Sequence, residues 1–457
     1  MTEKMEKAIQ AEWKVILYRS VVNDPLVVKF LSLLKETAKP QPDPSRALAL
    51  YNDFTASFIP AAAEVSTGGR FAWPNYLLKL ILLDENIFSR QAERFRLRDI
   101  PPQVKRMAEQ DLQYLQSVSQ VSGSLIREVL AGKIGRGFDV QNLPDWEGVY
   151  LNGKKETGGE RRNRVIRRIH RLDSWRKALK LLGDYYRENG VGIFGQHYAF
   201  RWVHKNGDGM LVGVKNPDTI QLNQLYEYER EQSRIIQNTE QFLRGYPANN
   251  VLLYGDRGTG KSSTVKALVN LYGERGLRLI EVQKQDLADF PLVISLLAER
   301  PQRFILFVDD LSFTEQEGQY RELKALLEGG LEARPQNVLV YATSNRRHLV
   351  QERFSDREIT GYDKEQDDVR YMDTMQEKLS LADRFGITVT FAAPDQKRYL
   401  AIVEKMARER GIDIPVEELH QRALKWEMSF NARSARTARQ FVDFLEGQLA
   451  LEADPGA

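Results

Sequence analysis

The residues best suited to chemistry lie at 255–262, which read Gly-Asp-Arg-Gly-Thr-Gly-Lys-Ser and match the spacing G-x-x-x-x-G-K-[ST]. Glycines there let the backbone turn tightly, so that its N–H groups point at a polyphosphate, and a following helix adds its positive end. We expect Lys261 to reach the β and γ phosphates and Ser262 to ligate Mg²⁺. The apolar run 250–254 favours this interpretation over a glycine-rich turn before an ordinary helix. The predicted nucleotide contacts are Gly255, Asp256, Arg257, Gly258, Thr259, Gly260, Lys261, Ser262 and Ser263.

Two carboxylates follow the apolar run 304–308. At a strand end beside a phosphate loop, we expect Asp309 to hold Mg²⁺, usually through water, and Asp310 to act on the attacking water. A solvated acidic turn is the alternative. Because Asp310 is one methylene shorter than the more common glutamate, Glu315 and Glu317 are the next candidates for the base.

Asn345 follows a third apolar run, 338–342. An amide at that position can hydrogen-bond the γ-phosphate or the attacking water. An asparagine that only opens a turn explains this single feature equally well.

The composition limits which other sites are possible. The chain has 457 residues, more than one ordinary core, and a net charge of +3. It has no cysteine, which excludes disulfides, thiolate zinc sites and thiol nucleophiles, and its five histidines lack metal-ligand spacing. No signal-like stretch opens the sequence and no apolar run is long enough for a membrane span. The expected location is therefore the cytoplasm.

The sequence pattern changes several times along the chain. Residues 1–195 show helical periodicity and predict a helical N-terminal domain, and residues 196–214 alternate as a hairpin that we expect to be a linker. Residues 215–393 alternate strands and helices, which predicts an α/β fold with a parallel sheet. A helical domain over 394–450 and a tail over 451–457 complete the chain. The five predicted strands are 251–254, 277–282, 304–308, 338–342 and 387–391.

The order of these features resembles the AAA+ ATPase family from residue 215 to about 450. The longer strings 252–263, 309–313 and 341–349 resemble a poorly characterised bacterial AAA+ group catalogued as a domain of unknown function. The resemblance implies an AAA+ P-loop core with a five-stranded parallel sheet, a C-terminal helical lid over 394–450 and ATP with Mg²⁺ as ligands.

The resemblance also implies roles for single residues. Arg384 matches the arginine finger that acts in trans on a neighbouring subunit, which implies a homo-oligomer; a helix-terminal cation is the alternative. Asn345 matches sensor 1, and Arg436 matches the lid arginine of sensor 2, with Arg433 as its rival. Glu227 replaces the glycine of the usual adenine-contact segment.

The macromolecule on which such an ATPase acts is less well defined. Residues 154–180 are strongly basic, which suggests a nucleic acid or another acidic partner, with a solvated helix face as the alternative. Residues 283–291 lack the aromatic-apolar-Gly triplet of remodellers that thread proteins. The charged stretch 346–372 is expected to be a surface insertion.

These features predict an AAA+ ATPase that binds Mg·ATP and couples hydrolysis or nucleotide state to action on an unidentified macromolecule. The alternative function is a nucleotide-dependent nucleic-acid-binding or scaffold protein with little turnover, resembling a replication initiator or helicase loader.

Overall fold

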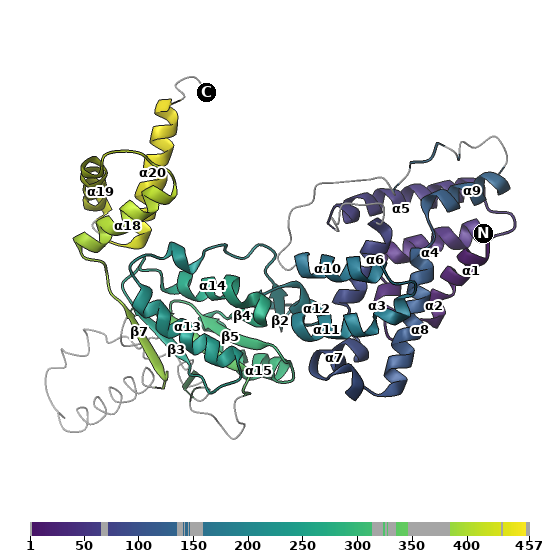
Figure 1. Ribbon diagram of the computed structural model, residues 1–457, viewed down its shortest axis with the longest axis horizontal. Helices are drawn as coiled ribbons and strands as arrows, with labels where there is room; N and C mark the ends of the chain where they lie inside the picture. Colours follow the sequence, from purple (N-terminus) through teal and green to yellow (C-terminus); the bar gives the residue numbers. More distant parts are fainter. Residues whose placement is uncertain are drawn as a thin grey trace. The chain divides into compact units, whose positions relative to one another are not determined.

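A computed structural model describes residues 2–64, 72–134, 140, 142–144, 146, 159–312, 323–324, 327, 335–345, 384–430 and 433–453. The chain divides into two compact units, Met1–His197 and Tyr198–Ala457. Figure 1 identifies the elements of each unit. No helix among the described residues is long and apolar enough to cross a membrane.

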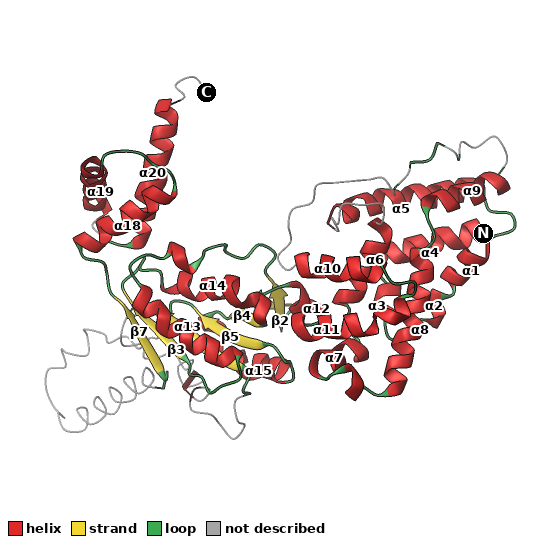
Figure 2. Ribbon diagram, viewed as in Figure 1, coloured by secondary structure: helices red, strands yellow, loops and turns green. Residues whose placement is uncertain are grey.

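The first unit is helical throughout its described part, as Figure 2 shows. Its α-helices surround a core rich in aromatic side chains, in which the rings of Phe30 and Trp73 lie 4.4 Å apart and those of Phe54 and Trp146 lie 5.0 Å apart. The helices are α1 (Thr2–Ile9), α2 (Ala11–Lys14), α3 (Arg19–Val22), α4 (Pro25–Ala38), α5 (Pro44–Glu64), α6 (Ala72–Leu83), α7 (Ile87–Arg94), α8 (Pro102–Ser119), α9 (Gly123–Lys133), α10 (Gly159–His170), α11 (Leu179–Asn189) and α12 (Gly192–Gln196), with 3₁₀ turns η1 (Leu97–Asp99) and η2 (Trp175–Ala178).

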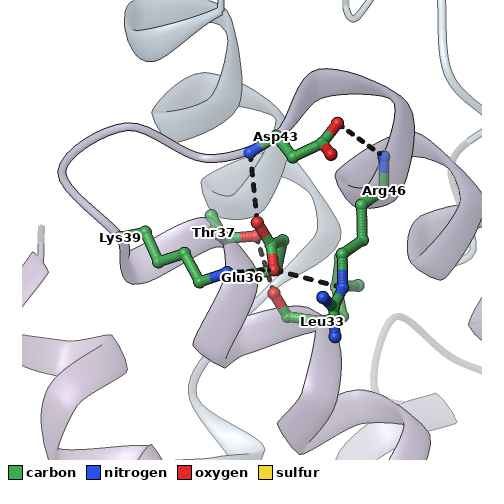
Figure 3. A network of polar contacts seen from close by, with 6 residues as sticks. All are labelled: Leu33, Glu36, Thr37, Lys39, Asp43 and Arg46. Carbon is green, nitrogen blue, oxygen red and sulfur yellow. Dashed lines mark hydrogen bonds and ion pairs between the residues drawn. The ribbon is translucent and has the colours of Figure 1, made fainter.

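Buried carboxylates connect these helices. Asp111 of α8 is fully buried and accepts hydrogen bonds from the backbone N–H groups of Ile16, Leu17 and Tyr18, just before α3. Near the end of α4, the buried carboxylate of Glu36 accepts from Lys39 Nζ at 2.7 Å (Figure 3). The hydrogen-bond donors to each of these carboxylates therefore come from the helical unit itself.

The turn between α4 and α5 closes around Glu36. Its carboxylate also accepts from the backbone N–H of Asp43 at 3.1 Å and pairs with Arg46 at 3.4 Å, and Figure 3 shows these groups converging. Burial acts to raise the pKa of Glu36, but these bonds and the two cations, Lys39 and Arg46, outweigh it, so that the net pKa is lowered.

The second unit contains a sheet with the strand order β2-β1-β4-β5-β6-β3-β7. The predicted α/β class is confirmed, but the sheet has seven strands rather than five. The hairpin expected as a linker belongs to the sheet, because β1 pairs in parallel with β4 and antiparallel with β2. The strands are β1 (Ala199–Lys205), β2 (Asp208–Gly213), β3 (Val251–Gly255), β4 (Leu277–Glu281), β5 (Arg303–Val308), β6 (Val338–Ser344) and β7 (Ile387–Phe391).

Alternate side chains of β3, β4, β5, β6 and β7 join one apolar cluster with helices α13 (Glu229–Leu243) and α14 (Lys261–Tyr272), so these two helices cover the same face. The strand that leads into the phosphate loop, β3, lies between β6 and β7. The carboxyl ends of β3, β5 and β6 therefore meet at one edge, where the loop begins. The remaining helical elements of this part are α15 (Phe290–Ala298), η3 (Leu222–Gln224), η4 (Gly273–Arg275) and η5 (Lys284–Asp289).

After β7 the chain forms three helices with a small core of their own: α18 (Gln396–Glu409), α19 (Val416–Phe430) and α20 (Ala435–Ala453). Tyr399, Val403 and Val442 are fully buried in this core, which Tyr226 also joins. These three helices match the predicted helical lid and are called the lid below.

Candidate nucleotide-binding site

The loop at 255–260 has a backbone that requires glycine at three positions. Gly255, Gly258 and Gly260 have φ angles of 141°, 77° and 92°. A Cβ on Gly255 would lie 2.0 Å from the carbonyl oxygen of Phe391, and one on Gly258 would lie 2.7 Å from Ser434 Oγ. Side chains at either position would fill the turn that lets the backbone N–H groups converge.

Lys261 begins α14, and only 6% of its surface is exposed. Its Nζ donates to the carbonyl oxygens of Gly255 at 2.8 Å and Asp256 at 2.6 Å, and to Asn345 Oδ1 at 3.1 Å. Burial lowers the pKa of Lys261, although Asp256, Asp310 and Asp309 act in the opposite direction. The ammonium is thus desolvated beside neutral acceptors, a setting that favours an incoming anion.

Asp309 lies one residue beyond β5 and receives two hydroxyl groups. Ser262 Oγ and Thr343 Oγ1 each donate to Asp309 Oδ1 at 2.5 Å. The hydroxyl of Ser262 and the carboxylate of Asp309 are hard oxygen donors of the kind that Mg²⁺ prefers, and such sites usually combine one or two protein groups with substrate phosphates. These residues therefore fit the metal that the sequence predicts there.

Asp310 has a φ of 52°, in the left-handed region that side chains other than glycine rarely adopt. Its backbone N–H donates to Thr343 Oγ1 at 2.9 Å, and its carboxylate accepts a hydrogen bond from Asn345 Nδ2. Because Asn345 Oδ1 accepts from Lys261, the amide of Asn345 links the lysine to the carboxylate. Backbone strain beside a cavity is common at functional sites.

A cavity of about 480 Å³ opens beside these groups. The lid contributes Met406, Ala435, Arg436 and Arg439 to its wall, and the backbone N–H of Arg436 donates to the carbonyl of Gly258 at 3.2 Å. Of the two candidates for the lid arginine, Arg436 lines the cavity, whereas Arg433 pairs with Glu427 at 3.1 Å. The described residues outside the lid that line the cavity are Gln224, Leu225, Arg257, Gly258, Gly260, Lys261, Ser262, Ser263, Asp309, Asp310, Thr343 and Asn345.

Other predicted loop residues contribute in different ways. The side chain of Thr259 is buried and donates to the carbonyl of Asp256 at 2.8 Å, which closes the loop internally. Gly255 lies at the end of β3, against Phe391. Asp256 is exposed and accepts a hydrogen bond from the backbone N–H of Ala393 at 2.8 Å.

The segment before α13 keeps the backbone that a glycine would have. Glu227 has a φ of 69°, although it is not glycine. Its carboxylate pairs with Lys405 at 2.7 Å, and its carbonyl accepts from Arg398. A second cavity of about 230 Å³ lies beside this segment and shares Gln224, Met406 and Arg439 with the first; its other lining residues are Asp218, Thr219, Ile220, Tyr226, Glu409 and Arg410.

Arg384 lies three residues before β7, is partly buried, and is not among the described residues that line the 480 Å³ cavity. Glu315, Glu317 and the stretch 346–372 lie outside the described residues. Sequence reasoning missed Thr343 and Arg439. Each had a signal: Thr343 stands two residues before Asn345 in a strand end, and Arg439 is one helical turn after Arg436.

The basic segment is only partly available to a partner. Within α10, Arg162 is buried, and after it Arg176 pairs with Glu109 at 3.6 Å and Lys177 with Asp173 at 2.8 Å. Lys154 and Lys155 lie outside the described residues. Exposed cations whose side chains have no hydrogen bond or ion pair within the described ranges are Arg164, Arg167, Arg168, Arg171 and Lys180.

Comparison with known proteins gives one family. The family described as "Protein of unknown function (DUF815)" matches residues 195–449, more than half of the chain. The search of curated proteins found no match to the chain. Among solved structures, the chain is similar to the Thermotoga maritima RuvB Holliday junction branch migration motor, with 14% identity, coverage of 49% of this chain and 72% of that chain, and a TM-score of 0.31. Two single-substitution variants of that protein give 14% and 15% identity with the same coverage and TM-scores of 0.32 and 0.30.

Proposed function

The chain belongs to the family described as Protein of unknown function (DUF815), and from its site we propose that it binds Mg·ATP and hydrolyses it as an AAA+ ATPase. The observation that carries this proposal is the continuous contact from Lys261 through Asn345 to Asp310 on the wall of one cavity. A phosphate-binding cation, a polar amide and a carboxylate beside a loop of convergent N–H groups are the parts that phosphoryl transfer to water requires.

In the binding step, Lys261 would exchange its backbone carbonyl partners for phosphate oxygens. The exchange is favourable because a phosphate oxygen carries negative charge, so that the ammonium gains a Coulombic attraction that a neutral carbonyl does not offer. The left-handed glycines 258 and 260 and the N-terminus of α14 would add backbone donors and a partial positive charge on the same side.

In the hydrolytic step, Asp310 would accept a proton from, or orient, the attacking water. Its carboxylate is hydrogen-bonded to Asn345. A γ-phosphate that accepts from Asn345 Nδ2 competes for this contact and would leave the carboxylate open to water. We propose that Asn345 thereby makes hydrolysis depend on the presence of the γ-phosphate.

Ser262 and Asp309 would hold Mg²⁺, and Thr343 would orient the carboxylate of Asp309 through its 2.5 Å hydrogen bond. When bound, the metal neutralises charge that develops on the β and γ phosphates. The hydroxyl of Ser262 now donates to Asp309 at 2.5 Å, so the two ligands already lie together.

The lid arginines and the second cavity would accommodate the rest of the nucleotide. Arg436 and Arg439 lie one turn apart on α20 and both line the cavity that contains the phosphate loop. We propose that Arg436 contacts the phosphates. The base end would extend toward Gln224 and Met406, which the two cavities share.

We also propose that the protein acts as a homo-oligomer in which Arg384 completes the site of a neighbouring subunit. The side chain of Arg384 does not line its own chain's cavity within the described residues. A cation that acts on the phosphates of a neighbour would add to the positive charge that the described residues of this cavity supply through Lys261, Arg257 and the lid arginines.

A second candidate function is nucleotide-dependent binding of a nucleic acid or acidic partner with little turnover. The exposed cations of α10, Arg164, Arg167 and Arg168, favour it, since no acid pairs with them among the described residues. Replacing these three by glutamate should abolish binding to a DNA duplex at low salt, and binding by the wild type should weaken steeply with salt. ATP hydrolysis measured with and without DNA would separate the two functions.

The proposed ATP site is tested by calorimetric titration of ATP into Lys261→Ala. Loss of a charge-assisted contact worth about 1.5–3 kcal/mol should weaken binding roughly tenfold to a hundredfold. Lys266→Ala is the matched control, because Lys266 lies on the same helix but does not line the cavity. Equal affinities for the two variants would contradict the assignment of the phosphate loop.

A further inference from the structure

Asp256 occupies the first variable position of the phosphate loop, where the spacing pattern requires no particular residue. Its carbonyl accepts from Lys261 Nζ at 2.6 Å. Its carboxylate accepts from the backbone N–H of Ala393 at 2.8 Å, and its own N–H donates to the carbonyl of Phe391 at 3.2 Å. One residue therefore contacts both the phosphate-binding lysine and the chain that leaves the sheet.

The segment 392–395 is the only covalent connection from the sheet to the lid, as Figure 1 lets the reader follow from β7 to α18. Ala392 and Ala393 are exposed and belong to no helix or strand. Asp395 caps α18 by accepting from the backbone N–H of Arg398 at 2.8 Å. A change in the direction of this short connection would turn all three lid helices together.

A second set of contacts joins the lid and its connection to the segment before α13. The hydroxyl of Tyr228 donates to the carbonyl of Ala392 at 2.8 Å. Two cations of α18, Arg398 and Lys405, bind the carbonyl and the carboxylate of Glu227. These contacts involve the segment before α13 and do not touch the phosphate loop. Within the described residues, the hydrogen bond from the loop to this connection is that of Asp256 with Ala393, beside the bond from the Asp256 N–H to Phe391 at the end of β7. The loop also reaches the lid directly, because the backbone N–H of Arg436 donates to the carbonyl of Gly258.

We propose that Asp256 is a positioning residue that couples occupation of the phosphate loop to the orientation of the lid. A phosphate that takes Lys261 away from the Asp256 carbonyl removes a cation from that peptide. The carbonyl then keeps only its hydrogen bond from Thr259 Oγ1. The peptide, having lost one of its two carbonyl partners, shifts, and its side chain moves the Ala393 N–H with it. The proposal rests on the proposed ATP site and adds a route by which its occupation places Arg436 against the phosphates.

According to this proposal, the coupling depends on the side-chain oxygen of residue 256 that accepts from the Ala393 N–H. Asp256→Asn retains an oxygen that can accept from Ala393, whereas Asp256→Ala retains only the backbone contacts. Because both variants keep the loop backbone and the exposed position, the difference between them reports on the Ala393 contact alone. Lys405→Ala, which breaks the Glu227 ion pair, is the comparison for lid contacts that do not involve the loop.

The chain has no cysteine, so two cysteines can be introduced for labelling without first replacing native ones. Ser295→Cys places one on the exposed surface of α15, and Gly447→Cys places the other on α20, where a Cβ meets no atom within 4 Å. The distance between spin labels at these sites is measured by electron paramagnetic resonance without nucleotide and with saturating Mg·ADP or a non-hydrolysable ATP analogue. Calorimetry establishes saturation for each variant.

The expected result is a nucleotide-dependent change in the label distance for the full-length wild type and for Asp256→Asn, and its loss in Asp256→Ala. Lys405→Ala should alter the distance distribution with and without nucleotide but keep the change between the two. The turnover number kcat should fall about tenfold or more in Asp256→Ala, because a small misplacement of a phosphate-contacting group is costly, and should recover in Asp256→Asn.

An unchanged nucleotide response in Asp256→Ala, with circular dichroism equal to that of the wild type, would overturn the coupling role and leave the ATP site intact. Loss of the response in Asp256→Asn as well would also overturn it, since the acceptor is still present. Absence of ATP binding by the wild type would instead overturn the proposed function, and this inference with it.

Discussion

The helical unit and the phosphate-loop region both bury charged groups, but they satisfy them in different ways. In the helical unit, Asp111 receives three backbone N–H groups, and no ligand is needed to complete its hydrogen bonds. At the phosphate loop, Lys261 is held by two carbonyls and an amide on the wall of a 480 Å³ cavity. Burial with fixed partners stabilises a fold, whereas burial beside a cavity with replaceable partners prepares a site.

The pKa shifts in the two regions have the same first cause. Burial raises the pKa of Asp84 to about 6, partly opposed by a hydrogen bond from Asn86, and burial lowers the pKa of Lys261. In both cases desolvation disfavours the charged form. The difference is that an anion can reach Lys261 through the cavity. Shifted pKa values alone therefore do not mark a site; the neighbouring space does.

The largest predicted effect concerns whether each region is complete within one chain. The helical unit satisfies its buried acids within one chain, whereas the ATP site is proposed to need a neighbour's Arg384. Arg384→Ala should bind ATP and lose hydrolysis about 10³-fold, as expected for an arginine finger. Steady-state phosphate release measures the rate.

Mixing Arg384→Ala with Lys261→Ala subunits should restore part of this activity, because some interfaces then pair an intact site with an intact finger. Specific activity of the wild type should also rise with protein concentration. Normal hydrolysis by Arg384→Ala alone would show that this arginine has no role in catalysis and is only a helix-terminal cation.

The next prediction tests whether buried acids of the helical unit are structural. Asp111→Ala leaves three backbone N–H groups without their acceptor, and should lower the free energy of unfolding of this unit by about 3–4 kcal/mol. Asp111→Asn, which keeps one acceptor oxygen, should cost less. Urea denaturation followed by circular dichroism measures both. ATP affinity, measured by calorimetry, should stay within about twofold of the wild-type value. A larger change would contradict the claim that Asp111 serves only the fold of the helical unit.

A smaller effect should appear in the pH dependence of stability. Folded Asp84 keeps its proton up to about pH 6, while the unfolded carboxyl loses it near its ordinary value of 3.8. The folded state is thus favoured at low pH, and this contribution is lost as the pH rises from about 4 to 6, by up to about 3 kcal/mol.

Asp84→Asn stays neutral throughout, so the difference in unfolding free energy between wild type and variant should change by that amount between pH 4 and 7. Urea denaturation at each pH measures it. A difference that does not vary with pH would mean that the Asp84 carboxyl ionises alike in both states.

Sequence alone predicted the features that depend on neighbours in the chain. The phosphate loop, the strands and the lid follow from local spacing, and the fold class that they predicted is confirmed. The role of Thr343 required the register that sets β5 beside β6, where Val308 pairs with Ala342. The hairpin was visible as alternation, but the pairing of β1 with β4 was not, because tertiary packing decides which strand a hairpin joins.

At Glu227 the residue type was visible in the sequence, but the backbone conformation was not. The sequence departs there from the glycine of the AAA+ resemblance, which left the adenine contacts open. The structure keeps a φ of 69° at this position and pays for the strained backbone with an ion pair to Lys405. A residue type alone could not reveal that the backbone shape is retained, because the stabilising cation lies far along the chain.

The measurement that tests the central claim most directly is ATP hydrolysis by Asp310→Asn. Asparagine tolerates the left-handed backbone at this position about as well as aspartate, so the loop should keep its shape. The account predicts that calorimetry finds ATP affinity close to that of the wild type, while turnover falls by about 10²-fold or more, because a neutral amide cannot take a proton from water. Hydrolysis at the wild-type rate would contradict the proposed catalytic role of this pocket's carboxylate.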